Sequence, residues 1–445
     1  MIKLLLLSLI PFIAFAQSKS TASIETYMSA HASVRQFSGS ALVVEQGKVI
    51  YEKSFGEADK EWQIKNTNQT KYRIGSNTKQ FTAACILKLH EQGKIKLDDK
   101  LSKYLPSYPK GDSVTVHMLL THTSGITDYT NLDAFWNTYA YVPIQPDSFI
   151  SVFKNKPYDF SPGTQCSYSN SGYYLLGIII EKASGESYSD YLNKYILNPA
   201  GLKDTGFDQL DAILDYRARG YYSVKDKYYN APYITMEGPW SAGALYSTSK
   251  DLYNWSKVLY TNKILTAESV KKMTTPYTRN ADNEPFGYGL IIDSLKSHRR
   301  IWHNGGIPGF SSYIAYYPAD DTHVIVLSNN SSNTSNIGTG LAYLLYNYPI
   351  EIPYIHKEVK ISPSELEKFV GKYDAPTPFE IIIKDNKLYR HRPTGKDIEL
   401  KAESNNRLFY ADDSDRQLEF IVDSNKKVTK AFLIVSGIKT EIRKI

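Results

Sequence analysis

The stretch Arg73-Ile-Gly-Ser76-Asn-Thr-Lys79-Gln-Phe-Thr82 opens a segment whose apolar residues recur at helical spacing up to Gln92, just before Gly93. Side chains three positions apart project from one face of a helix, so Ser76 and Lys79 are predicted to lie one turn apart. A lysine in a desolvated pocket has a lowered pKa and takes a proton from a serine hydroxyl, which makes that hydroxyl nucleophilic. A helix-capping serine followed by a solvated lysine gives the same pattern, so the motif needs partners elsewhere in the chain.

A second motif, Ser167-Tyr168-Ser169-Asn170-Ser171-Gly172, precedes the apolar run from Tyr173 to Ile180, for which we predict a helix that ends near Gly185. Tyr168 is a candidate proton relay, and Asn170 is a candidate hydrogen-bond partner for a substrate amide. An ordinary turn before a helix has a similar composition.

A third motif, Trp302-His303-Asn304-Gly305-Gly306, is entered from a predicted strand that begins near Arg300. Consecutive glycines let another backbone approach closely. The N–H of Gly306 can then join the N–H of Ser76 in binding a developing oxyanion.

In this order and at these separations, the three motifs resemble the serine β-lactamase and penicillin-binding protein superfamily. The similarity is to its class C β-lactamase-like branch, which includes D-alanyl-D-alanine carboxypeptidases, D-aminopeptidases and esterases. It covers most of residues 38–330. Further matching segments are Leu119-Leu-Thr-His-Thr-Ser-Gly-Ile126, Asn198-Pro-Ala-Gly-Leu-Lys-Asp-Thr-Gly-Phe207 and Gly243-Ala-Leu-Tyr-Ser-Thr-Ser-Lys-Asp-Leu252 with Trp255.

The resemblance implies a role for each motif residue. It implies Ser76 as the acylated nucleophile, Lys79 with Tyr168 as the proton-handling pair, and the Ser76 and Gly306 amides as the oxyanion hole. The predicted substrate-binding residues are Asn170, His303, Asn304 and Gly305. Neither a metal nor an organic cofactor is implied.

The third motif departs from the β-lactamase form, which usually has Lys-Thr-Gly where this chain has His303-Asn304-Gly305. A lysine there is a cation suited to a substrate carboxylate, whereas an ordinary histidine is mostly neutral at pH 7. We therefore expect weak β-lactam hydrolysis. Carboxylate binding could fall to Arg299 or Arg300, although strand-edge arginines are usually just solvated.

The fold expected from these patterns is α+β. A hairpin over 37–55 and later strands over 300–303, 311–317 and 324–328 are predicted to form one antiparallel sheet, flanked by helices and a helical subdomain. This β-lactamase/transpeptidase-like domain is predicted over 20–348, and prolines mark a linker over 349–363. Short strand-like runs over 364–445 predict a small antiparallel β-barrel domain.

Composition and the first residues limit location and partners. The 445 residues have a net charge of +6 without a basic cluster, which argues against nucleic-acid binding. Residues 1–16 resemble a cleaved signal peptide, whose apolar part is too short to span a bilayer. We expect a periplasmic or secreted protein with no membrane span after signal removal. Pairing of Cys85 with Cys166 stays open, and the spacing of His117 and His122 does not suit a metal site.

The expected function is that of an exported serine hydrolase that acts through an acyl-enzyme. A D-amino-acid peptide substrate of the DD-carboxypeptidase type is favoured, and candidate partners are small molecules or peptides, including peptidoglycan fragments. The alternatives are a carboxylesterase, a weak β-lactamase, or an acyl-binding or sensing protein without turnover. Trp240 either lines the cleft or packs in the core.

Overall fold

The computed structural model describes residues 19–209, 211–224, 227–375, 377–393, 395–412, 414–425 and 427–445. The predicted signal peptide at residues 1–16 lies outside these ranges. Within them, no helix has the length and apolar character that crossing a membrane requires. Both Cys85 and Cys166 are free thiols.

The β-lactamase/transpeptidase-like domain predicted over 20–348, called the catalytic domain below for its predicted role, is built around an eight-stranded antiparallel sheet. The strand order is β10-β11-β12-β13-β14-β15-β1-β2. The N-terminal hairpin joins the late strands through β1 and β15, where Leu42 lies opposite Ile325, so the predicted single sheet is confirmed. The strands of the sheet are β1 (Gly39–Glu45), β2 (Lys48–Phe55), β10 (Thr278–Arg279), β11 (Pro285–Phe286), β12 (Ile291–Leu295), β13 (His298–Ile307), β14 (Phe310–Tyr317) and β15 (Thr322–Ser328).

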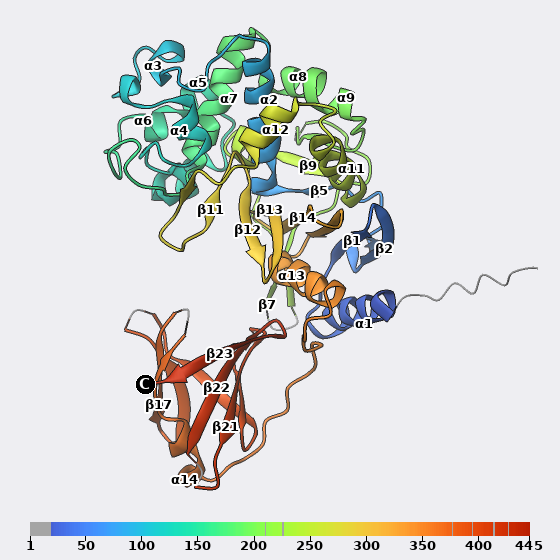
Figure 1. Ribbon diagram of the computed structural model, residues 1–445, viewed down its shortest axis with the longest axis vertical. Coiled ribbons are helices and arrows are strands. Elements are labelled where there is room, and N and C mark those ends of the chain that lie inside the picture. Colours follow the sequence, from blue (N-terminus) through green and yellow to red (C-terminus); the bar gives the residue numbers. More distant parts are fainter. Residues whose placement is uncertain are drawn as a thin grey trace, which may run out of the picture.

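Alternation along the strands gives this sheet two apolar faces. Ala41 and Val43 of β1 pack toward α1 (Lys19–Val34) and α13 (Thr334–Leu345), which cover one face. Leu42 and Val44 belong to the larger core on the other face, beneath the helical region. Figure 1 shows α1 and α13 on the side of the sheet toward the C-terminal barrel, and the helical region on the opposite side.

Two buried helices, α2 (Thr78–Glu91) and α7 (Asn170–Ser184), form the centre of the helical region. The predicted end of the second helix is confirmed, because Gly185 adopts the left-handed conformation after α7. The other helices here are α3 (Leu101–Tyr104), α4 (Val116–Leu120), α5 (Pro146–Phe149), α6 (Ser151–Lys154), α8 (Tyr188–Leu192), α9 (Asn198–Ala200), α10 (Trp240–Gly243), α11 (Ser249–Tyr260) and α12 (Ala267–Met273).

Short elements connect these helices to the sheet. The 3₁₀ turns and π-helical turns are η1 (Gly75–Asn77), η2 (Gly111–Ser113), η3 (Tyr129–Asn131), η4 (Phe135–Tyr139) and η5 (Asn193–Leu197). The short strands are β3 (Glu57–Asp59), β4 (Ile64–Lys65), β5 (Tyr72–Arg73), β6 (Gly206–Phe207), β7 (Tyr221–Val224), β8 (Lys227–Asn230) and β9 (Leu245–Ser247). Of these, η1 matters most for the site, because it contains Ser76.

The C-terminal region is a closed eight-stranded antiparallel barrel, as predicted. Residues 349–362 contain neither helix nor strand, and closure occurs where Tyr373 of the first barrel strand pairs with Lys444 of the last. The elements are α14 (Pro363–Leu366), η6 (Glu367–Phe369), β16 (Gly371–Asp374), β17 (Phe379–Lys384), β18 (Lys387–His391), β19 (Ile398–Ser404), β20 (Arg407–Tyr410), β21 (Arg416–Val422), β22 (Val428–Val435) and β23 (Ile438–Lys444).

One end of the barrel faces the catalytic domain (Figure 1). From the loop between β20 and β21, Asp415 accepts a hydrogen bond from Arg35 at 2.6 Å. From the turn between β22 and β23, the Ser436 hydroxyl accepts a hydrogen bond from Asn336 at 3.0 Å. The two domains therefore meet through polar contacts just after α1 and at α13, and Ile438 of β23 packs on the apolar core beside these helices.

Candidate active site

The turn that carries Ser76 lies directly against β13. Gly75 has a φ of +51°, and a Cβ atom there would lie 2.8 Å from the Gly306 nitrogen. A Cβ atom on Gly305 would lie 1.9 Å from the Ile74 carbonyl oxygen. Only glycine allows contacts this close, so Gly75 and Gly305 bring the backbone around Ser76 next to that of Gly306.

The register of β13 and β14 decides the direction of the Gly306 N–H. Ile307 and Phe310 close a two-residue hairpin, so they form a hydrogen-bonded pair. Hydrogen-bonded and non-hydrogen-bonded pairs alternate, which makes Gly306 and Ser311 a non-hydrogen-bonded pair. The Gly306 N–H therefore points away from β14, toward the opposite edge of β13. In the described chain, pairing of β13 with β12 ends at Trp302, so no β12 residue is paired with Gly306 at this edge.

Lys79 lies one turn beyond Ser76 and is fully buried. Its Nζ donates hydrogen bonds to Ser76 Oγ at 3.1 Å, to Asn170 Oδ1 at 2.7 Å and to the Ala242 carbonyl of α10 at 2.8 Å. Burial lowers the pKa of Lys79 to about 7, although the Asp128 carboxylate opposes the shift. Near neutral pH, a substantial fraction of this amine is unprotonated and able to accept a proton from Ser76.

Tyr168 completes the predicted group of three side chains. Lys79 Nζ lies 4.8 Å from the centre of its ring, and its hydroxyl is buried without a hydrogen-bond partner of regular geometry in the described chain. Burial raises the pKa of Tyr168, and the nearby Ser76 hydroxyl lowers it only in part. The phenol therefore stays protonated at neutral pH, which favours Lys79 as the resting base.

Asn170 holds the lysine from the opposite side. While its Oδ1 accepts from Lys79, its Nδ2 donates to Asp128 at 3.0 Å and to Thr130 at 3.2 Å. Both amide hydrogens are thus occupied in the free protein, so the predicted bond to a substrate amide would need at least one of them to be released. Here Asn170 links the buried carboxylate of Asp128 to Lys79.

The residues of the third motif fall on opposite faces of β13. His303 is 2% exposed, its ring centre lies 6.1 Å from that of Tyr168, and its Nδ1 contacts the Asn304 carbonyl. Burial, together with the charge of Lys79, lowers the pKa of His303 to about 4, so the ring is neutral at pH 7. Asn304 alternates with His303 and Gly305, so its exposed side chain projects from the other face.

Neither arginine near the third motif is a free carboxylate binder. Arg300 is buried and donates to both oxygens of Asp293, at 2.8 and 2.6 Å, while it stacks on Trp302. Arg299 is exposed and donates to the Thr274 carbonyl at 3.1 Å. The suggestion that one of them binds a substrate carboxylate therefore has no support in this arrangement.

Comparison with known proteins supports the family resemblance that the three sequence motifs indicate. Residues 25–346 match the beta-lactamase family. The chain belongs to this family. Penicillin-binding protein 4* of Bacillus subtilis (strain 168) is 29% identical over 399 residues, which cover 84% of this chain and 88% of that protein. This beta-lactamase family member is therefore related to penicillin-binding proteins, and the members of its family are serine hydrolases.

Solved structures share the fold of this family member. The octameric penicillin-binding protein homologue from Pyrococcus abyssi superimposes with a TM-score of 0.69 and 29% identity, over 95% of this chain and 99% of that one. A D-stereospecific amidohydrolase from Streptomyces sp. has a TM-score of 0.63 and 25% identity, over 72% of this chain and 97% of that one. The first comparison includes the C-terminal region as well as the catalytic domain.

A cavity of about 220 Å³ opens beside Ser76. It reaches Asn170 and Gly306, but most of its lining is apolar. Its apolar side chains are Phe135, Trp136, Ile234, Pro239, Ala242, Ile307 and Pro308. A group bound next to Ser76 therefore meets mainly hydrocarbon and aromatic surface. Trp240, in contrast, is 5% exposed and packs on Tyr174 and Tyr188, which places it in the core.

Sequence reasoning missed the supporting residue Asp128, and it did not connect His122 with Tyr168. The His122 ring stacks on Tyr168 with 4.5 Å between ring centres, and its Nδ1 accepts a hydrogen bond from the Ser169 N–H at 3.1 Å. Burial lowers the pKa of His122 well below its ordinary value, so it packs as a neutral ring. The motif Leu119 to Ile126 was a signal for His122, whereas no local pattern pointed to Asp128.

Proposed function

We propose that this protein is an exported serine hydrolase of the class C β-lactamase-like branch, which cleaves an amide or ester through an acyl-Ser76 intermediate. The observation that carries the proposal is the hydrogen bond from a buried lysine with a pKa of about 7 to Ser76 Oγ. Export rests on the sequence of residues 1–16.

In the proposed acylation step, unprotonated Lys79 takes the Ser76 proton as Oγ attacks the substrate carbonyl carbon. The carbonyl oxygen becomes an oxyanion, which the N–H groups of Ser76 and Gly306 bind. When the tetrahedral species collapses, the carbon–nitrogen or carbon–oxygen bond breaks. The leaving group receives the proton from Lys79, directly or through the Tyr168 hydroxyl.

In the proposed deacylation step, water attacks the acyl carbon and loses a proton to the same pair. Ser76 leaves and recovers a proton, which returns the site to its starting state. Lys79 and Tyr168 thus act as base and acid in both halves of the cycle.

For the substrate, we propose the amide of a D-amino acid whose leaving group is uncharged, with a carboxyl ester as the second candidate. A carboxypeptidase substrate presents a free carboxylate. His303 is neutral, and Arg300 is already paired with Asp293. Neither residue therefore offers a free positive charge to bind such a carboxylate. The apolar lining of the cavity and the likeness to a D-stereospecific amidohydrolase favour the uncharged amide, and the same lining also suits an ester.

A matched pair of peptides tests this proposal. We expect an acyl-D-alanyl-D-alanine peptide with an amidated C-terminus to be hydrolysed with a higher kcat/KM than the same peptide with a free carboxylate. A fluorophosphonate probe should label the wild-type chain but not Ser76→Ala. Faster turnover of the free acid would contradict the substrate class, and labelling of Ser76→Ala would contradict the nucleophile. A single stoichiometric burst without further product would instead indicate an acyl-binding protein.

A further inference from the structure

Three arginine side chains gather at the end of the barrel that faces the catalytic domain. Arg390 lies on β18 on the same face as Leu388, which belongs to the barrel core, so its side chain points inward near the end of the strand. Arg392 follows β18, and Arg416 begins β21. All three arginines act electrostatically on the phenol of Tyr410. We refer to Arg390, Arg392 and Arg416 as the arginine cluster.

The charges of the cluster are not balanced. Arg416 donates to Asp412 at 2.6 Å and to the Ser414 hydroxyl at 2.8 Å, and it stacks over Tyr410. Arg390 is 6% exposed, and its Nε has no hydrogen-bond partner in the described part of the chain. The Nε of Arg392 is also buried without a partner there. Asp412, the carboxylate bonded to the cluster, is thus paired with Arg416 rather than with Arg390 or Arg392.

A buried guanidinium nitrogen without a partner is costly, because its N–H donor loses its hydration. Burial, and then the charge of Arg392, lowers the pKa of Arg390, and the Asp412 carboxylate opposes this shift only in part. The planar fork of a guanidinium matches the paired oxygens of a carboxylate or a phosphate. An oxyanion is therefore the chemical group that this cluster lacks.

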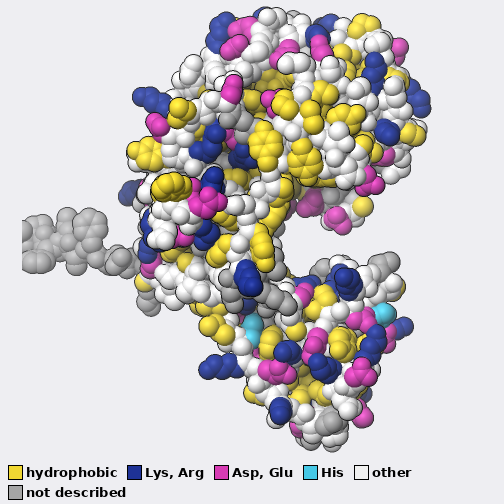
Figure 2. Space-filling view, turned by 180° about the vertical axis from the view of Figure 1, so that it is seen from behind, with side chains coloured by type: hydrophobic (Ala, Val, Ile, Leu, Met, Phe, Trp, Pro, Cys, Tyr) yellow, Lys and Arg dark blue, Asp and Glu magenta, His cyan; other side chains and the backbone are white. Residues whose placement is uncertain are grey.

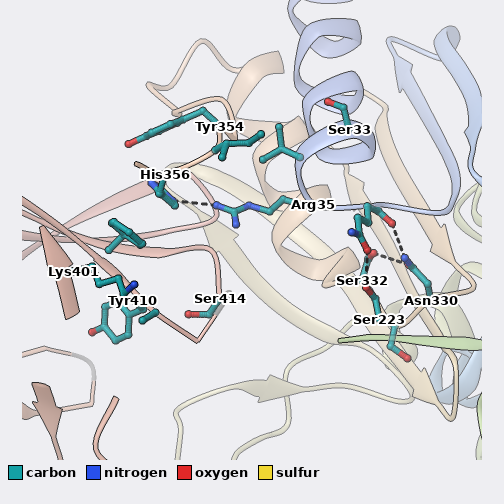
Figure 3. A pocket seen from close by; sticks show the side chains of 16 residues that line it. Ser33, Arg35, Ser223, Asn330, Ser332, Tyr354, His356, Lys401, Tyr410 and Ser414 are labelled. Atoms are coloured by element: carbon teal, nitrogen blue, oxygen red, sulfur yellow. Dashed lines mark hydrogen bonds between the residues drawn. The ribbon is translucent and has the colours of Figure 1, made fainter. Parts of the chain in front are cut away.

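A route for such a group adjoins the cluster. Tyr410 and Ser414, which contact Arg416, also line a cavity of about 780 Å³ between the barrel, α1 and the segment around His356 (Figure 3). Figure 2 shows the hollow between the two domains into which this end of the barrel faces. The side chains of Arg416 and Asp412 are 27% and 31% exposed.

Other cations of this cavity already have partners. Arg35 is bound to Asp415 at 2.6 Å and to the His356 ring at 3.2 Å, and Lys401 is bound to Glu358 at 2.8 Å. The positive charge that is available to an anionic group entering the hollow therefore lies at the arginine cluster.

We propose that the arginine cluster is a binding site for an oxyanion group, a carboxylate or a phosphate, carried by a ligand that enters between the barrel and the catalytic domain. Arg390 supplies the buried guanidinium that pairs with the anion. Arg392 and Arg416 flank it, and the ring of Tyr410 forms the adjoining wall. This site does not depend on the chemistry proposed for Ser76.

The test uses the full chain and two matched variants. Arg390→Met keeps the length of the side chain without the charge. Lys430→Met removes an exposed barrel cation that lies 3.9 Å from Glu441. We would measure binding of inorganic phosphate and of succinate by calorimetry at constant ionic strength. One of the two anions should bind to wild type and Lys430→Met alike, and at least tenfold more weakly to Arg390→Met. The anion that binds more tightly identifies the source.

Equal binding to all three proteins would indicate an adventitious ion only and would overturn the proposal, as would no binding to wild type. Thermal unfolding separates ligand binding from a structural role. In buffer without either anion, Arg390→Met should unfold at the same temperature as wild type or at a higher one, because a buried cation whose Nε lacks a partner is gone. A lower unfolding temperature would make Arg390 a structural residue and would also overturn the proposal.

Discussion

Lys79 Nζ lies 3.1 Å from Ser76 Oγ, and the other two acceptors of the lysine, on Asn170 and Ala242, are fixed by separate helices. An ammonium group has three hydrogens, so the protonated form satisfies all three acceptors at once. The neutral form has two hydrogens and one lone pair. It can keep its bonds to Asn170 and Ala242 while the lone pair accepts the Ser76 hydroxyl.

This arrangement predicts the pH dependence of acylation. Because the pKa of Lys79 is lowered to about 7, kcat/KM should rise with pH through about 7 and level off above it, as the amine loses its proton. The measurement is the rate of fluorophosphonate labelling from pH 5 to 9. Lys79→Met should lose this rise with pH, the acidic limb of the profile, together with most of the rate. A limb unchanged in Lys79→Met would assign the titration to another group.

Replacing Asp128 tests the electrostatic balance of the lysine. The Asp128 carboxylate raises the pKa of Lys79 against the effect of burial, so Asp128→Asn should lower that pKa further. The acidic limb of the pH profile should then move below pH 7, and the loss of the charged acceptor for Asn170 should lower the plateau. Thr130→Val is the matched control, because it removes the other Asn170 contact without removing a charge. A limb that shifts equally in both variants would argue against a charge effect.

His122 is expected to act as a positioning residue for Tyr168. In His122→Phe the ring stacking can persist, but the Ser169 N–H loses its buried acceptor, at a cost of about 1–3 kcal/mol in the free energy of unfolding. If the hydrogen bond from Ser169 to His122 sets the position of Tyr168, acylation should slow by more than the loss of folded protein explains, and Tyr168→Phe/His122→Phe should be no slower than Tyr168→Phe. Additive losses in the double variant would contradict the coupling.

The sequence predicted the parts of the site that depend on local spacing. One helical turn separates Ser76 from Lys79, and the glycines of the third motif predict that another backbone segment approaches β13 closely. Asp128 could not be found this way, because its link to Lys79 runs through Asn170, which is 42 positions away in the chain. Tertiary packing also decided the state of His303, since burial and the neighbouring lysine, rather than its residue type, hold it neutral.

In the barrel, too, local patterns predicted some strands, whereas others depend on long-range pairing. The strand-like runs that predict the barrel from the sequence are 379–383, 387–390, 408–410, 418–422 and 431–435, and all of them lie within observed strands. Three strands were missed, namely β19 and the first and last strands, β16 and β23. β16 is short, and of the seven residues of β23 only Ile442 is buried, so neither has a strong apolar alternation. They become strands because pairing of Tyr373 with Lys444 closes the barrel, and such a long-range contact leaves no local signal.

A pair of glycine variants tests the oxyanion hole directly. In Gly305→Ala the new methyl group would meet the Ile74 carbonyl oxygen at 1.9 Å, so β13 must move away from the turn that carries Ser76. Gly306→Ala is the matched control, because a Cβ atom there has no neighbour within 4 Å in the described structure and the backbone N–H is kept. Loss of one oxyanion donor typically costs about 10²–10³ in kcat, and we expect Gly305→Ala to approach this loss while Gly306→Ala stays near wild type. Circular dichroism would show whether both variants remain folded. If folded Gly305→Ala kept wild-type kcat, the close contact between β13 and the Ser76 turn would not be what aligns the two N–H donors.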